Sequence, residues 1–370
     1  MSDSVTAAGR PLRAGVVGVG WAGQEHMKGY DALPDVELVA IAAKETDKVS
    51  QLADKFGAAG RYDDVDTMLA EADLDVVSLA TPTAMHSPMS VTALDAGVHV
   101  LCEKPMAEAA EQARSMVTAA EANNRVLEVT FNKRRGRETV ALAQAIEEGV
   151  LGEIYYVKAG WVRRRGIPGL GTWFTRKAMA GGGPMMDIGI HVLDMALHVM
   201  GEPDVSTVSG ATYAHFGPRG LGGSAGGGSN KWGSVDDGSA PFEVEDLGTA
   251  FVRMGNGATL LLEASWAQFV PRDRIYLEVY GSEGSADLEL AVGERPGSLT
   301  LTTDVAGMPA VIEPVLGPQG GHAEAVADFV SAVRSGDWSA HRGHVGLKRT
   351  DIIDACYASA DAGAEVALGG

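Results

Sequence analysis

The chain has 370 residues, more than one compact core usually includes, so two domains are expected. Its net charge of −19 disfavours nucleic acid and anionic membranes as partners, and an anionic ligand would need a local basic pocket. No apolar run approaches the roughly 18 residues that span a bilayer, and residues 1–11 lack the apolar core of a signal peptide. With only two cysteines, a disulfide framework and a cysteine metal cluster are excluded, and a cytoplasmic location is expected.

The first distinctive feature is the stretch from Leu12 to Gly23, LRAGVVGVGWAG. Its apolar, β-branched run predicts a buried strand, which leads into a G-x-G-x-x-G turn and then a helix over residues 24–33. The first glycine permits the tight turn, the second lets the backbone approach a pyrophosphate, and the third lets helix and strand pack closely. The helix N-terminus offers free N–H groups to phosphates, so a dinucleotide-binding site is predicted. The alternative is a glycine-rich connector without function.

Strands and helices alternate through the first 132 residues. The predicted strands are 14–19, 36–42, 74–80, 98–102 and 126–131, and the helices between them are 24–33, 47–56, 65–70, 88–96 and 108–123. This alternation predicts an α/β domain with a doubly wound parallel sheet over residues 1–132, with residues 1–11 as a flexible tail. Ligands bind such sheets at the carboxyl ends of the strands. The residues at these ends, which would line one crevice, are Gly18, Ala43, Thr81, Glu103, Lys104 and Asn132.

The end of the second predicted strand bears on the choice of cofactor. An NAD-binding unit usually carries Asp or Glu there, bonded to the ribose hydroxyls. Here Ala43 occupies the position and Lys44 follows it. A missing carboxylate and a neighbouring cation favour NADP(H) slightly over NAD(H), whereas Glu45 argues mildly for NAD(H). The alternative for Lys44 is a solvated surface lysine.

In the second half of the chain, helices are predicted at 138–148, 322–335 and 345–368, and a further helical pattern follows the glycines and proline at 181–184. The predicted strands of this half are 154–163, 205–214, 244–254, 258–266, 274–280, 285–290 and 299–302. The pair Asn256-Gly257 is a strong hairpin signal, so we expect a large, mostly antiparallel sheet in an α+β domain over residues 133–370. The glycine-rich residues 217–230 predict a flexible loop, which is either a lid or a tip without a role.

The sequence GGGPMMDIGIH at 181–191 is the most informative stretch of the second half. Asp187 and His191 lie four residues apart, so on a helix they share one face. A carboxylate bonded to an imidazole orients the ring and raises its basicity, which suits a general base that takes the proton of an alcohol. A surface ion pair is the alternative, but the apolar residues around the pair disfavour it.

Other residues of interest lie at strand ends and in loops. Lys104 could stabilise the oxygen of a reacting alcohol, or it could pair with Glu103. His86 is a candidate contact for the nicotinamide or its ribose. Arg163, Arg165 and Trp173 could bind a polar or sugar substrate, although a basic turn and simple packing explain them equally well. The histidine spacings match no common metal motif, so no metal is predicted.

Taken together, these motifs resemble the Gfo/Idh/MocA oxidoreductase family, which includes glucose–fructose oxidoreductase and the inositol dehydrogenases. The resemblance extends from about Leu12 to the last predicted helix. It rests on GVGWAG at 18–23, ATPTAMH at 80–86, CEKP at 102–105, FNKRR at 131–135, GGGPMMDIGIH at 181–191 and EDLGTAFVRMGNGATLLLEASW at 245–266.

The resemblance implies a Rossmann domain followed by a domain whose open sheet often builds homodimers or homotetramers. It implies a catalytic set of Lys104, Asp187 and His191, with His191 as acid/base and Asp187 as its partner. The positions that it implies for cofactor contact are Gly18, Gly20, Trp21, Ala22, Thr81, Pro82, His86, Glu103 and Asn132. Two departures are Ala43, where the family usually has an acid, and Thr83, where it usually has asparagine.

We therefore expect an NAD(P)-dependent dehydrogenase that acts on a secondary alcohol of a sugar, glycoside or cyclitol. The segment WVRRRGIPGLGTW at 161–173 looks like that of a subgroup acting on glycosides or sugars, in which oxidation at C3 is a theme. One alternative is a catalytically silent NAD(P)-binding regulator of the same fold, which the intact catalytic set disfavours. The other is a reductase of a non-sugar substrate, such as a pyrrole or an imine.

Overall fold

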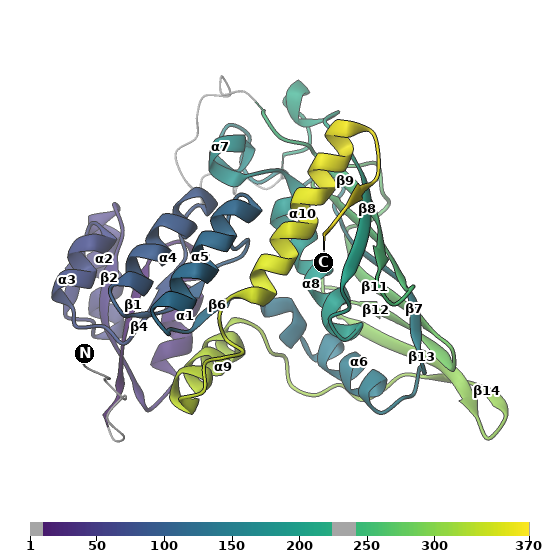
Figure 1. Cartoon of the computed structure of the whole chain (residues 1–370), viewed down its shortest axis with the longest axis horizontal. Coiled ribbons are helices and arrows are strands. Elements are labelled where there is room, and N and C mark those ends of the chain that lie inside the picture. The colour runs from purple at the N-terminus through teal and green to yellow at the C-terminus, as the bar shows by residue number, and fades with distance from the viewer. Residues whose placement is uncertain (1–9, 224–241, 370) are drawn as a thin grey trace. The chain divides into compact units, whose positions relative to one another are not determined.

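The computed structural model describes residues 10–223 and 242–369 (Figure 1). The chain forms two compact units: unit 1 comprises residues 1–132 and 321–348, and unit 2 comprises residues 133–320 and 349–370. Most of the expected N-terminal tail, and residues 224–230 of the expected glycine-rich loop, lie outside the described residues. Among the residues that are described, no helix is long and apolar enough to cross a membrane.

Unit 1 is built on a six-stranded parallel sheet with the order β3-β2-β1-β4-β5-β6. The strands are β1 (Leu12–Val17), β2 (Val36–Ala42), β3 (Gly60–Tyr62), β4 (Val76–Leu79), β5 (His99–Cys102) and β6 (Leu127–Val129). This order is that of a Rossmann fold, in which the chain reverses direction beside β1 and leaves a crevice at the carboxyl ends of β1 and β4. The predicted fold class is confirmed for this unit.

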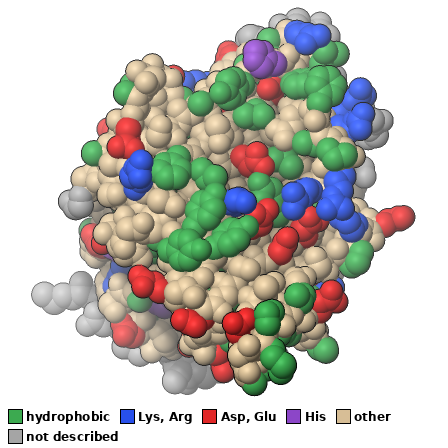
Figure 2. All heavy atoms as spheres, turned by 90° about the vertical axis from the view of Figure 1, so that its right-hand side faces the viewer, with side chains coloured by type: hydrophobic (Ala, Val, Ile, Leu, Met, Phe, Trp, Pro, Cys, Tyr) green, Lys and Arg blue, Asp and Glu red, His purple; other side chains and the backbone are tan. Residues whose placement is uncertain are grey.

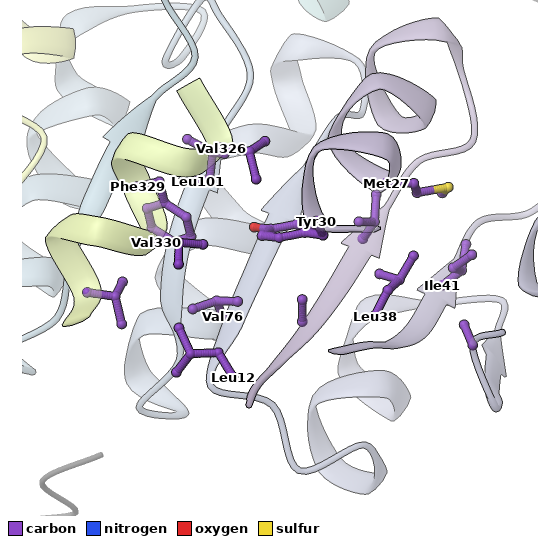
Figure 3. Packing of buried hydrophobic residues seen from close by; sticks show 14 of the residues in the cluster. Leu12, Met27, Tyr30, Leu38, Ile41, Val76, Leu101, Val326, Phe329 and Val330 are labelled. Atoms are coloured by element: carbon purple, nitrogen blue, oxygen red, sulfur yellow. The ribbon is translucent and has the colours of Figure 1, made fainter. Parts of the chain in front are cut away.

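The helices of unit 1 connect these strands, and one of them comes from far along the chain. They are α1 (Trp21–Asp31), α2 (Thr46–Phe56), α3 (Val65–Glu71), α4 (His86–Asp95), α5 (Ala110–Ala122) and α9 (His322–Ser335), with a short 3-10 turn η1 (Thr83–Met85). Figure 3 shows Val326, Phe329 and Val330 of α9 packed in the same buried cluster as Val76 and Leu101. The predicted second domain, 133–370, therefore differs from unit 2 in one segment, because the apolar face of α9 is buried in the core of unit 1.

Unit 2 contains a nine-stranded sheet with the order β14-β13-β12-β11-β7-β10-β9-β8-β15. The strands are β7 (Ile154–Val162), β8 (Val205–Tyr213), β9 (Leu247–Met254), β10 (Thr259–Ser265), β11 (Arg274–Gly281), β12 (Gly284–Glu289), β13 (Ser298–Val305), β14 (Met308–Ile312) and β15 (Val366–Ala367). Only β7 and β10 pair in parallel among these strands, so the expected mostly antiparallel sheet is confirmed.

Unit 2 also contains helices, and the three longest of them cover one face of this sheet. The helices are α6 (Arg137–Glu147), α7 (Lys177–Ala180), α8 (Ile190–Val199) and α10 (His344–Ala362, of which residues from Arg349 belong to this unit), together with the short turns η2 (Asn132–Arg135), η3 (Trp173–Thr175), η4 (Met185–Gly189) and η5 (Gly217–Arg219). Helix α10 ends before the predicted Leu368, because Gly363 takes a positive φ of 61° and the chain then forms β15. The opposite face of the sheet is the one turned to the viewer in Figure 2.

Candidate active site

The glycine turn after β1 has the geometry of a phosphate cradle. Gly18 has a φ of 102°, and a Cβ atom there would lie 2.2 Å from the carbonyl oxygen of Ala80. A Cβ atom on Gly23 would lie 2.0 Å from the carbonyl oxygen of Gly18, so α1 packs directly on the turn. Gly20 precedes α1 in an extended conformation and, having no side chain, does not cap the helix, so the first turn, at Trp21 and Ala22, can offer N–H groups to an anion.

The loops after β4 and β5 are joined by His86. Its Nδ1 lies 2.8 Å from the carbonyl oxygen of Pro105, and its Nε2 lies 2.9 Å from that of Thr81. The ring is buried, and burial lowers its pKa. The predicted cofactor contact of His86 stays a prediction, since both ring nitrogens already face backbone carbonyls. The hydroxyl of Thr81, which precedes Pro82, is buried without a hydrogen-bond partner among the described residues, as expected where a polar ligand binds.

Glu103, directly after β5, lies between two imidazoles that sequence reasoning missed. Its Oε1 is 3.0 Å from Nε2 of His26 and 3.5 Å from Nε2 of His322, and its Oε2 accepts the backbone N–H of Lys104 at 3.2 Å. Asn132 donates to Nδ1 of His322 at 3.2 Å, so the proton of that ring lies on Nε2 and faces the carboxylate. Burial opposes the ionisation of Glu103, but its bonds to His26 and His322 outweigh burial and hold its pKa well below the usual range.

The side chains of His26, Glu103 and His322 also form a set whose ligand atoms lie within 4.8 Å of one another, as in a metal site. The hydrogen bonds already account for this arrangement. Metal-bound histidines usually donate their second ring N–H to an acceptor, whereas Nδ1 of His26 is buried without a partner among the described residues. Imidazole N–H groups that donate to one carboxylate explain the geometry, and the absence of a metal stays a prediction.

The remaining predicted residues of unit 1 occupy the expected strand ends. Lys104 is half-buried after β5 and joins Pro105 through a cis peptide bond. Ala43 is half-buried after β2 and Lys44 is exposed. The pKa of Asp64 is lowered chiefly by its hydrogen bonds from Thr67, with a smaller contribution from the charge of Lys44, so Lys44 lies near a carboxylate. Asn132 follows Phe131 just beyond β6, and its Oδ1 is buried without a partner among the described residues.

In unit 2, the stretch 181–191 folds as a π-helical turn, η4, that continues into α8. Asp187 lies on the π turn and His191 in the first turn of α8. Such turns inside helices often occur at functional sites. Oδ2 of Asp187 accepts the indole N–H of Trp266 at 3.0 Å, and Trp266 is fully buried at the end of β10. The side chain of His191 is buried, and its ring centroid lies 5.6 Å from that of Trp161 on β7.

Basic side chains surround Trp161. The guanidinium carbon of Arg163 lies 4.9 Å from the Trp161 ring centroid, and Nζ of Lys133 lies 5.4 Å from it. Burial lowers the pKa of Arg163, while the charge of Asp187 opposes this effect. The structure therefore places Arg163 near the predicted pair of Asp187 and His191. Arg165 is exposed, and the ring centroid of Trp173 lies 3.8 Å from that of Phe174, so the substrate contacts of these two residues stay predictions.

The comparisons with known proteins agree with these two units. Residues 12–131 match the model of the oxidoreductase family with an NAD-binding Rossmann fold, and residues 139–287 match the GFO/IDH/MocA C-terminal domain. The chain is 38% identical over 268 residues to the D-glucoside 3-dehydrogenase of Escherichia coli K12, covering 72% of this chain and 73% of that protein.

Two further similarities concern levoglucosan dehydrogenases. The chain is 30% identical to the levoglucosan dehydrogenase of Pseudarthrobacter phenanthrenivorans, covering 74% of this chain and 72% of that protein. A solved levoglucosan dehydrogenase in complex with NADH and levoglucosan superposes with a TM-score of 0.83 at 26% identity, covering 98% of this chain and all of the other. The two domain matches extend over most of the sequence, and the chain therefore belongs to the Gfo/Idh/MocA family of oxidoreductases with an NAD-binding Rossmann fold.

Proposed function

We propose that this protein is an NAD(P)-dependent dehydrogenase that oxidises a secondary alcohol of a sugar, glycoside or cyclitol. The observation that carries the proposal is the arrangement in unit 2, where His191 and Asp187 lie among Trp161, Arg163 and Trp266. An imidazole beside aromatic and basic side chains suits a polyhydroxylated substrate. Similarity to a D-glucoside 3-dehydrogenase and to levoglucosan dehydrogenases supports this class, and makes the C3 hydroxyl of a glycoside our first candidate.

The residues of unit 1 fit the coenzyme. Gly18, Gly20 and the first turn of α1 form the phosphate cradle. Two buried oxygen atoms, Thr81 Oγ1 and Asn132 Oδ1, have no hydrogen-bond partner among the described residues and could accept one from the coenzyme. When bound, the nicotinamide coenzyme accepts the hydride that leaves the alcohol carbon. We assign to His191 the removal of the hydroxyl proton, to Asp187 its orientation, and to Lys104 the stabilisation of the alcohol oxygen by its ammonium group.

Two substitutions test these roles. We expect Lys104→Ala and His191→Ala each to lower kcat by about 10²–10⁴-fold, because each removes a group that acts on the alcohol. The affinity for the coenzyme, measured by fluorescence titration, should be nearly unchanged. Lys177→Ala and His215→Ala, at exposed positions of unit 2, serve as matched controls and should behave like the parent. If both active-site variants oxidise the substrate as well as the parent, the site assignment is wrong.

The substrate class is tested with a panel of sugars, glycosides and cyclitols, scored by the absorbance of the reduced coenzyme. Turnover of at least one of these compounds is expected. Binding of the coenzyme without turnover of any compound would favour a silent regulator. Turnover only of pyrroles or imines would favour the reductase.

For the coenzyme, we propose a modest preference for NADP(H) over NAD(H). The support is the exposed Lys44 beside Ala43, where an NAD-binding unit usually carries an acid. Titration with both coenzymes should give tighter binding of NADP(H), and Lys44→Asp should shift the preference toward NAD(H), because its carboxylate repels a 2′-phosphate. NAD(H) binding tighter by about tenfold, a difference of about 1.4 kcal/mol, would contradict the preference.

We further propose that the protein is a homodimer or homotetramer formed through the face of the unit 2 sheet that α8 leaves open. Figure 2 shows hydrophobic side chains gathered on this side among acidic and basic ones. Leu261 of β10 is 39% exposed there, while its neighbours Leu260 and Leu262 are buried on the other face.

A cytoplasmic location is consistent with Cys102 and Cys356, which are both free and buried.

A further inference from the structure

Glu245 is a buried carboxylate just before β9 that the roles assigned above do not use. Its Oε2 accepts the backbone N–H of Gly183 at 3.0 Å. Its Oε1 accepts the backbone N–H of Met185 at 3.1 Å and the hydroxyl of Tyr357, on α10, at 2.8 Å. Pro184, between the two amides, has no N–H to offer. A single carboxylate therefore bonds the amides of Gly183 and Met185 at the start of the π turn.

The glycines of the GGGP loop permit this close approach. A Cβ atom on Gly183 would lie 2.2 Å from the carbonyl oxygen of Glu245, and one on Gly182 would lie 2.0 Å from the hydroxyl oxygen of Tyr357. On the far side, a Cβ atom on Gly248 of β9 would lie 2.2 Å from Cγ of Met185. The loop is thus pressed against Glu245 and Tyr357, and a larger side chain at these positions would push it away.

A helix needs partners for the N–H groups of its first turn, and a negative charge is favourable there. Glu245 supplies both to η4, whose π-helical hydrogen bonding is less regular than that of an α-helix. Burial raises the pKa of Glu245, while the donors Gly183, Tyr357 and Met185 oppose that rise and favour the ionised form.

The same segment also supports the partner of Asp187. The backbone N–H of Trp266 donates to the carbonyl oxygen of Asp246 at 3.0 Å, and its indole donates to Asp187. Residues 245 and 246 therefore fix the start of the helix that carries Asp187 and His191, and also the backbone of the tryptophan that bonds Asp187.

We propose that Glu245 is a positioning residue for the dehydrogenase reaction: by bonding the amides of Gly183 and Met185, it fixes the π turn so that Asp187 and His191 hold their productive orientation. Glu245 acts through these residues and does not itself meet the substrate. Its effect on turnover rests on the function proposed above, whereas its effect on the turn can be measured without a substrate.

The test compares Glu245→Gln and Tyr357→Phe with Glu243→Gln. Glutamine keeps the size of the side chain but turns an N–H donor toward a backbone donor, so the turn loses one of its two anchors. Tyr357→Phe removes the hydroxyl that donates to Glu245 and accepts the backbone N–H of Met186, but keeps both bonds from the amides of Gly183 and Met185 to Glu245. Glu243, an exposed acid two residues away that accepts the backbone N–H of Lys177 at 3.0 Å, is the matched control.

For Glu245→Gln we expect kcat to fall by about 10²-fold, because small misplacements of reacting groups have effects of this size. The affinity for the coenzyme should not change, and the primary deuterium isotope effect on kcat should rise as the chemical step becomes limiting. Tyr357→Phe should show the same changes to a smaller degree, and Glu243→Gln should show none. An unchanged kcat in Glu245→Gln, or a fall that matches a loss of folded protein with an unchanged isotope effect, would overturn the proposal.

Amide hydrogen exchange of the peptide containing residues 181–191 gives a second measurement, which needs no substrate. Exchange in the folded protein should be faster in Glu245→Gln than in the parent, and unchanged in Glu243→Gln. If the parent oxidises no sugar while exchange changes as expected, the proposed function fails and the positioning of the turn stands. If exchange is the same in the parent and in Glu245→Gln, the positioning role fails, whatever the substrate.

Discussion

Two imidazoles and a backbone amide converge on the carboxylate of Glu103, and this arrangement has a consequence for acid stability. The pKa of Glu103 in the folded protein lies below its ordinary value of 4.5, because the bonds to His26 and His322 outweigh burial. A lowered folded pKa adds stability that is fully present above the pKa of the unfolded chain and is lost as the pH falls below it. Glu103 therefore stabilises unit 1 at neutral pH and loses this effect in acid.

We predict that Glu103→Gln lowers the free energy of unfolding by about 1–3 kcal/mol at neutral pH, because the imidazoles lose a charged acceptor. The difference from the parent should stay constant down to the ordinary glutamate pKa of 4.5 and be smaller at about pH 3.5 than at about pH 7, because below 4.5 the unfolded chain binds a proton that the folded protein does not. Urea denaturation at both pH values measures the difference in the free energy of unfolding between Glu103→Gln and the parent. The control is Glu121→Gln, which breaks an exposed pair with His344 at 3.1 Å and should have little effect. A pH-independent difference would contradict this role of Glu103.

The residues of the candidate site that sequence reasoning found are those that lie next to a motif. Gly18 and Glu103 follow apolar strand patterns, and Asp187 and His191 share a helical spacing. The partners that hold them are distant in sequence: His322 is 190 residues from Asn132, Trp266 is 79 from Asp187, and Glu245 is 62 from Gly183. No local periodicity links such pairs, because they meet only once the sheets have formed.

At the scale of elements, α9 shows how a late helix completes an early core. Phe329 is 1% exposed and shares a buried cluster with residues of β1, β4 and β5. We predict that Phe329→Ala lowers the free energy of unfolding of unit 1 by about 3–5 kcal/mol, the usual loss for a buried phenylalanine. Urea denaturation followed by far-UV circular dichroism measures this. Ser331→Ala, at an exposed position of the same helix, should leave stability unchanged, and equal stability of both variants would show that α9 is not needed for the core.

The elements that the sequence predicts well are the long periodic ones. Strands β7 and β11 lie where they were predicted, to within one residue at their ends, and α9 has the predicted bounds. The strands β3, β14 and β15 were missed. Three and two residues are too few for a periodic signal in β3 and β15, and β14 contains a proline, which makes a strand harder to recognise. The π turn η4 was predicted as ordinary helix, because its local spacing of apolar residues does not distinguish the two, and the carboxylate that its first amides bond, Glu245, is distant in sequence.

At the scale of the whole molecule, the chain passes between the two units three times, after Asn132, after Gly320 and after Lys348. Sequence periodicity showed that residues 322–335 form a helix with one apolar face, but an apolar face does not specify which core will bury it. The predicted boundary therefore assigned this segment to the second domain. Only the packing of Val326, Phe329 and Val330 in the unit 1 cluster determines where it belongs.

The open face of the unit 2 sheet is where assembly is expected. In the strand register, Leu261 of β10 is opposite Lys158 of β7 and Phe251 of β9, and Lys158 bonds Glu278 of β11 at 2.8 Å. Residues opposite each other share a face, so apolar and paired charged side chains lie in one row across four strands. A stable dimer buries about 1,200–2,000 Å² in total, an area that a sheet of this size can supply.

We predict that the parent elutes as a dimer or tetramer and that Leu261→Glu elutes as a monomer, because a second copy would have to bury the added charge without a partner. Size-exclusion chromatography with light scattering measures the mass. Val140→Glu, which places the same charge at a 52% exposed position of α6, is the control and should keep the parent's mass. If Leu261→Glu also keeps that mass, the copies associate through another surface. A monomeric parent would mean that the sheet face stays in contact with solvent.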